Sequence, residues 1–144
     1  MKRRNRSVVP LLFLVMLVVV GALMAQGNRT LVQVNLTGTS NDPTLLVTPT
    51  RATICLTATA TCPDQAQWRY VGRQLADNET IVISPKEGAP NCFTAGTFTL
   101  SRQLQEIDSG TATCPANSEW GYDVTLYRDG EAITVLDPMM VIDP

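Results

Sequence analysis

The chain has 144 residues and a formal net charge of −2, and it contains no histidine. The length allows one domain of ordinary size, and the absence of histidine excludes an ordinary Ser-His-Asp triad and the commonest metal ligand. Four of the 11 basic residues precede position 7, so 7 basic residues face 13 acidic ones in the remainder, which leaves no basic patch for nucleic acid.

The first 25 residues have the pattern of a targeting segment. Basic residues between Lys2 and Arg6 precede an apolar run over residues 8–25, which ends in small residues. This order is typical of a secretory signal peptide. The run has 18 residues, a length that just spans a membrane, so an N-terminal helix retained as a membrane anchor is the alternative. Both interpretations place residues 26–144 outside the cytoplasm, secreted, periplasmic or at the cell surface.

Nearly every element predicted after residue 25 is a short β-strand. Residues 26–41 form an N-terminal strand and linker, in which apolar and polar residues alternate over 30–36. Residues 42–144 form the domain proper, with turn residues at a spacing of about 8–12, which predicts an all-β, antiparallel sandwich of immunoglobulin-like character. Only residues 101–107 indicate a helical turn. Further strands are predicted at residues 45–47, 51–56, 67–71, 80–83, 92–100, 120–127, 132–136 and 139–142.

Two predicted strands are bounded by prolines, at residues 42–49 and 137–144. Proline suits an edge strand because it removes a hydrogen-bond donor from the exposed ladder. We therefore expect both segments at sheet edges. The alternative is exchange of a strand with a partner protein.

The four cysteines fit two disulfides formed in an oxidising compartment. Cys55 and Cys92 each open a Cys-Leu/Phe-Thr-Ala run, and Cys62 and Cys114 each follow Thr-Ala-Thr. This parallel predicts the pairs Cys55–Cys62 and Cys92–Cys114, each closing the base of a hairpin. Because residues 57–60 contain no Gly or Pro for a turn, the pairing Cys55–Cys92 with Cys62–Cys114 is the alternative. No Cys-x-x-Cys spacing occurs, which disfavours a metal site.

Two segments of the chain resemble each other at a constant offset of 52 residues. The repeat predicts two related halves, at about 52–90 and 91–138, with the four matching aromatic side chains in the core. A carbohydrate-stacking platform is the alternative role for these aromatics. Asp129-Gly130 predicts a type I′ hairpin turn. The matching pairs include Trp68 with Trp120, Tyr70 with Tyr122, and Asp77-Asn78 with Asp129-Gly130.

No constellation of residues predicts a catalytic centre, a metal site or a cofactor site. The carboxylates of Asp129 and Glu131 are interpreted as solvated turn residues, with calcium binding or a paired-carboxylate glycosidase as alternatives. We expect a non-catalytic binding or structural module with an unidentified protein or surface partner. A secreted enzyme inhibitor or hydrolase accessory protein that uses the long loop 97–110 is the alternative.

Three sequons predict N-glycosylation sites in a cell that glycosylates exported proteins. They begin at Asn28, Asn35 and Asn78. Asn78 belongs to a predicted hairpin turn, so we expect it to be the most accessible of the three.

Overall fold

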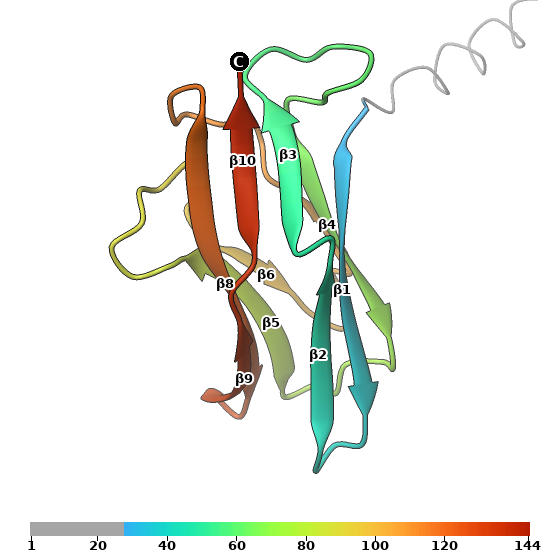
Figure 1. Ribbon diagram of the computed structural model, residues 1–144. Coiled ribbons are helices and arrows are strands. Elements are labelled where there is room, and N and C mark those ends of the chain that lie inside the picture. Colours follow the sequence, from blue (N-terminus) through green and yellow to red (C-terminus); the bar gives the residue numbers. More distant parts are fainter. Residues whose placement is uncertain (1–27) are drawn as a thin grey trace, which may run out of the picture.

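The computed structural model describes residues 28–144, and all regular structure in this part of the chain is β (Figure 1). The predicted targeting segment lies outside the described residues. Residues 28–144 contain no helix with the length and apolar character needed to cross a membrane. The all-β prediction is confirmed for the described part of the chain.

The strands form two sheets, which we call sheet A and sheet B. Sheet A has the order β2-β1-β4-β7, and sheet B has the order β3-β10-β8-β5-β6, with β9 paired to β8 beside this path. The strands of sheet A are β1 (Thr30–Gly38), β2 (Pro43–Thr48), β4 (Ala66–Gly72) and β7 (Glu106–Asp108). The strands of sheet B are β3 (Arg51–Cys55), β5 (Glu79–Pro85), β6 (Phe98–Leu100), β8 (Ser118–Arg128), β9 (Glu131–Leu136) and β10 (Met139–Asp143).

Both sheets are mixed, so the expectation of purely antiparallel sheets is wrong in two places. β1 pairs in parallel with β4, and β3 pairs in parallel with β10. Parallel neighbours need a connection that crosses over rather than a tight hairpin. The chain supplies one by passing from β2 in sheet A to β3 in sheet B before it returns to β4.

The core lies between the two sheets, where the apolar residues of each strand alternate inward. On β8, for example, Trp120, Tyr122, Val124 and Leu126 are all fully buried. Trp68 of β4 reaches them from sheet A, with its ring centroid 6.1 Å from that of Trp120. The strand alternation read from the sequence therefore marks the face that is buried.

The two similar segments take different positions in the fold. β4 and β8 carry the matching aromatics, and β5 and β9 follow them at the same offset. However, β8 and β9 form a hairpin within sheet B, whereas β4 and β5 belong to different sheets. The shared sequence thus produces similar strands but not similar pairing, and an origin by duplication stays a prediction.

Several local expectations are corrected. Residues 101–107 form no helical turn, because β7 begins at Glu106 and pairs with β4. The strand expected over 92–100 contains only β6, since Gly96 adopts a positive φ of 71° within it. β2 is an edge strand as expected, but β10 is interior, between β3 and β8. The chain enters β10 beside β8, where Tyr122 donates its amide hydrogen to the carbonyl of Pro138.

The Asp129-Gly130 turn is confirmed as type I′. Both residues have positive φ angles, 53° and 81°, and Arg128 pairs with Glu131 across a two-residue loop. Positive φ at both central positions matches the right-handed twist of the flanking strands. The turn therefore fixes where β9 begins.

Candidate interaction surface

Both predicted disulfides are confirmed. Cys55–Cys62 closes the passage from β3 in sheet B to β4 in sheet A, with Cα atoms 5.7 Å apart. Cys92–Cys114 joins the segments that precede β6 and β8, with Cα atoms 4.8 Å apart. The hairpin expectation is wrong for Cys55–Cys62, because β3 and β4 lie in opposite sheets. Beside Cys92–Cys114 the two chain segments do pair, through an antiparallel bridge between Phe93 and Ala112 and a hydrogen bond from the amide of Thr113 to the carbonyl of Cys92 at 2.8 Å. The base of that loop is therefore closed as expected, although β6 and β7 within it lie in opposite sheets. Each bond limits how far neighbouring connections can separate.

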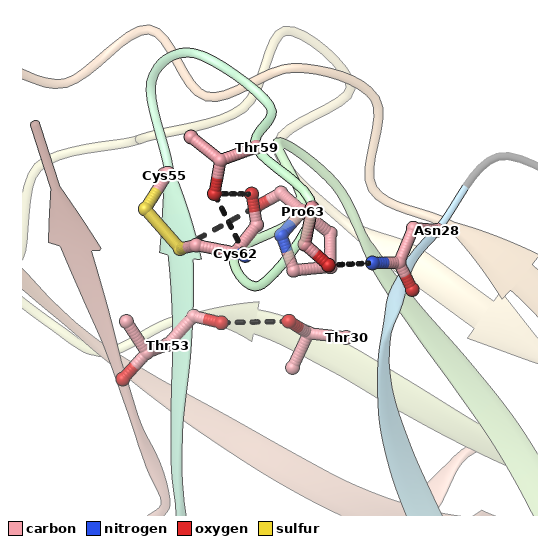
Figure 2. The surroundings of a disulfide bond; sticks show 8 residues. Asn28, Thr30, Thr53, Cys55, Thr59, Cys62 and Pro63 are labelled. Atoms are coloured by element: carbon pink, nitrogen blue, oxygen red, sulfur yellow. Dashed lines mark hydrogen bonds between the residues drawn. A yellow bond between two sulfur atoms is a disulfide. The ribbon is translucent and has the colours of Figure 1, made fainter.

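Threonine makes the tight turn that the Cys55–Cys62 loop needs without Gly or Pro (Figure 2). The hydroxyl of Thr59 accepts the amide hydrogen of Cys62 at 3.0 Å, and the amide of Thr59 donates to the carbonyl of Cys62 at 2.8 Å. Such side-chain-to-backbone bonds mimic a backbone turn. The start of β1 is tied to the same region, since Thr30 donates its hydroxyl to the carbonyl of Thr53 at 2.7 Å.

The four repeat aromatics cannot form a carbohydrate platform, because their rings are in the core. Trp68, Trp120 and Tyr122 are fully buried and Tyr70 is 6% exposed. Trp120 and Tyr122 stack with ring centroids 4.6 Å apart. Burial raises the pKa of Tyr122 to about 12, so its hydroxyl stays protonated at neutral pH. These side chains stabilise the packing between the two sheets and present no ring face to solvent.

Glu79 is the one buried acidic residue among residues 28–144, and both of its carboxylate oxygens accept hydrogen bonds. Arg73 binds both of its carboxylate oxygens at 2.7 and 2.8 Å, and Arg128 binds one of them at 2.8 Å. The hydrogen bonds from Arg73, with those from Ala76 and Arg128, lower the pKa of Glu79 to about 2 although burial opposes this shift. A carboxylate held in this way is a structural anchor between β4, β5 and β8 rather than a proton acceptor.

The remaining predicted carboxylates do not converge on one point. Asp129 accepts two hydrogen bonds from the amide of Asn78 at 2.9 and 3.0 Å, and Asp77 binds Arg102 at 2.8 Å. Glu131 is exposed at the start of β9. Within residues 28–144, no group of three or more acidic or cysteine side chains is arranged to hold a metal ion.

The three sequons differ in environment. Asn28 is exposed and donates its amide hydrogen to the carbonyl of Ala60 at 3.2 Å. Asn35 is half-buried in the middle of β1, between β2 and β4. Asn78 is exposed in the connection from β4 to β5, which crosses between the sheets and is not the hairpin expected from the sequence. Asn28 and Asn78 are therefore the accessible pair.

Much of the loop expected at 97–110 is strand. β6 and β7 occupy residues 98–100 and 106–108, so only residues 101–105 connect them. That connection is closed by a hydrogen bond from the amide of Ser101 to the carbonyl of Leu104 at 2.9 Å. Leu104 is 47% exposed, and it is the single large apolar side chain that the connection presents to solvent.

The most exposed apolar side chains of the strands lie on β2 and β9. Leu46 on β2 is 51% exposed, and Ile133 and Val135 on β9 are 39% and 52% exposed. Both strands lie in the lower half of Figure 1, and β2 is the edge of sheet A. Between them is a groove of about 230 Å³, lined mainly by carbon. Its lining residues are Leu46, Val47, Thr50, Leu136, Asp137 and Pro138.

We call this groove, together with Ile133 and Val135, the β2/β9 seam. β9 bonds to β8 along one edge, and within residues 28–144 no strand pairs with its other edge, which faces β2. The alternating sequence of 132–136 predicts the strand, but its position at the open side of the sandwich depends on long-range pairing. The seam is therefore a candidate site that the sequence does not reveal.

Comparison with known proteins adds no assignment. No model of a known protein family matches the chain, and no curated protein matches it significantly. The function must therefore be argued from the residues and their geometry.

Proposed function

We propose that this chain is an exported, non-catalytic β-sandwich that binds a partner outside the cytoplasm. Two disulfides support an oxidising location, because such bonds persist mainly in extracytoplasmic compartments. The basic start and apolar run of residues 2–25, which are typical of an export signal, also support a location outside the cytoplasm. Among residues 28–144 the one buried carboxylate, that of Glu79, is held by two arginines, and the other carboxylates lie nearer the surface.

The sandwich that we propose is of immunoglobulin-like type. Its two facing sheets enclose buried tryptophans on β4 and β8, and the hydroxyl of Tyr70 donates to the carbonyl of Arg73 three residues later. Facing sheets, a buried core tryptophan and a tyrosine bonded to nearby backbone are features of that class. In this chain β1 lies between β2 and β4, and the disulfides involve β3 and the segments before β4, β6 and β8 rather than a link between the two sheets across the core.

The observation that carries a binding role is the β2/β9 seam. An exposed apolar surface beside an unpaired strand edge normally causes aggregation, and natural proteins retain one mainly where a partner covers it. Leu46 and Val135 are each about half exposed and flank an apolar groove. In this proposal the two sheets hold the β2/β9 seam in a fixed shape, and the seam binds the partner.

Site-specific photo-crosslinking in intact cells of the source organism tests this role. A photoreactive residue replaces Val135 in one variant and Leu104 in a matched control, since the two positions are 52% and 47% exposed. We expect discrete adducts from position 135 and none from position 104. The absence of adducts from position 135, with the protein folded and in its native compartment, would argue against a binding role for the seam.

A further inference from the structure

The turn between β8 and β9 joins an aspartate to a glycine, and this pair has a reactivity that the binding role does not use. Asp129-Gly130 is the one Asp-Gly pair in the chain, and both residues are exposed. Glycine has no Cβ to shield its backbone nitrogen. A Cβ built at Gly130 would meet nothing within 4 Å, so no neighbouring group crowds that side of the turn.

The reaction open to this pair is isomerisation of the aspartate. The nitrogen of Gly130 attacks Cγ of the protonated Asp129 carboxyl, a C–N bond forms, the nitrogen loses its proton and one water leaves, which closes a succinimide ring. A second water then opens the ring. Addition at the main-chain carbonyl carbon of Asp129 leaves the chain running through Cγ as isoaspartate, whereas addition at Cγ restores aspartate. One water is lost and one is gained, so no other reactant is needed.

Asn78 holds the reacting carboxyl group in place. Its side-chain amide donates to both carboxylate oxygens of Asp129, at 2.9 and 3.0 Å, and its backbone carbonyl accepts the amide hydrogen of Asp129 at 3.0 Å. Asn78 directly precedes β5, which pairs with β8 as far as Arg128. Ring closure expels one carboxyl oxygen as water and turns Cγ toward the nitrogen of Gly130. The hydrogen bonds to both oxygens must therefore be broken before the ring closes.

The similar segment earlier in the chain offers an internal comparison. Asp77-Asn78 stands 52 residues before Asp129-Gly130. Asp77 is also exposed, and its carboxylate binds Arg102 at 2.8 Å. The residue that follows Asp77 carries a side chain, which hinders attack by its backbone nitrogen. Of these two matching aspartates, we expect the one followed by glycine to react faster.

We propose that Asp129 is a site of isoaspartate formation and that Asn78 is the residue that restrains the reaction. Isoaspartate adds one carbon to the main chain inside the two-residue loop that Arg128 and Glu131 close. Type I′ geometry, with positive φ at both central residues, belongs to a loop of that length. The modification therefore disturbs the pairing of β9 with β8 where β9 begins. The inference does not depend on the proposed binding role.

Peptide mass spectrometry and enzymatic methylation of isoaspartate, after incubation of the whole oxidised protein, test the proposal. The protein comes from a host that does not glycosylate asparagine, and a synthetic peptide of residues 126–133 gives the rate without the fold. Asn78→Ala should raise the rate at Asp129 about tenfold over wild type, because a hydrogen bond to an ionised group contributes about that factor. Asn41→Ala, in the exposed connection from β1 to β2, should leave the rate unchanged. Asp77 should react more slowly than Asp129 in each protein.

The outcomes separate the site from its restraint. If the peptide forms no isoaspartate under the same conditions, the modification site is wrong. If wild type reacts as fast as the peptide, or only as fast as Asn78→Ala, Asn78 does not restrain the reaction. Both asparagine side chains are exposed, so circular dichroism should show the wild-type fold in each variant. In modified protein the amides of β9 should exchange hydrogen faster than in fresh protein, and unchanged exchange would contradict the predicted disturbance of β9.

Discussion

At the scale of single residues, Glu79 is the polar group on which the packing of β4, β5 and β8 depends most. It is 2% exposed and neutralises two arginines that are themselves only partly exposed. Glu131 occupies the matching position 52 residues later, yet it is exposed. The same residue type is thus an anchor in one segment and a surface charge in the other, because the two segments are paired differently.

Replacement of Glu79 by glutamine should destabilise the protein strongly. The change removes the carboxylate and leaves Arg73 and Arg128 without their shared anion, and loss of one partner of a buried ion pair costs about 3–5 kcal/mol. Urea unfolding measures the effect. The matched control, Glu131→Gln, should change the free energy of unfolding by less than about 0.5 kcal/mol. Equal effects of the two substitutions would show that Glu79 is not an anchor.

The pKa of Glu79 also predicts how stability depends on pH. The pKa is lowered from 4.5 to about 2 in the folded protein, so the unfolded chain takes up the proton first. The stabilisation is complete above about pH 4.5 and is lost as the pH falls toward 2. Urea titrations over this range should show a steeper loss for wild type than for Glu79→Gln. If the free energy of unfolding fell with pH equally in wild type and Glu79→Gln, the lowered pKa of Glu79 would be contradicted.

Gly72 should tolerate no side chain. A Cβ atom there would lie 2.3 Å from the carbonyl oxygen of Leu36 and 2.6 Å from the side-chain oxygen of Asn35. Gly88 also has a positive φ, 79° against 112° at Gly72, but a Cβ there would meet nothing within 4 Å. Gly72→Ala should therefore lower the melting temperature well beyond the effect of Gly88→Ala, because it adds the clash and the less favourable φ. An equal fall in melting temperature for the two variants would contradict the predicted clash at Gly72.

At the scale of elements, the two disulfides should contribute differently because they close chain segments of different length. Their sequence separations are 7 and 22 residues. Loop-closure entropy gives roughly 2.5 kcal/mol for Cys55–Cys62 and roughly 3.5 kcal/mol for Cys92–Cys114. Paired Cys→Ala variants should follow that order in urea unfolding. The reverse order would indicate that residual structure in the unfolded chain outweighs loop length.

The sequence predicted where the strands lie along the chain better than it predicted which strands pair with each other. The strands around Trp68 and Trp120, the turn at Asp129-Gly130 and both cysteine pairs are local patterns, and the structure contains them. β7 was missed because it has three residues, two of them acidic. The hairpin expected at Cys55–Cys62 was wrong because nothing local shows that the chain crosses from sheet B to sheet A there. The β2/β9 seam was missed for the same reason, since it exists only once β8 is paired.

At the scale of the whole molecule, two sheets enclose an aromatic core, and an apolar groove lies where β2 and β9 approach each other. The groove is lined by residues of β2, of the turn after β2, and of β9 and the connection to β10. The core is rich in aromatic contacts, with Trp68 touching four other rings. A rigid core of this kind keeps the seam in one shape, which reduces the conformational entropy lost on binding.

The proposed binding role requires that an oxidised two-sheet scaffold, assembled outside the cytoplasm, holds the seam in place. Peptide mass spectrometry under non-reducing conditions, on protein isolated from its native host, measures whether the scaffold is oxidised. We expect two linked species, Cys55 with Cys62 and Cys92 with Cys114, and no free thiol. Free thiols, or the cross-pairing of Cys55 with Cys92, would contradict both the fold and the compartment on which the proposed function depends.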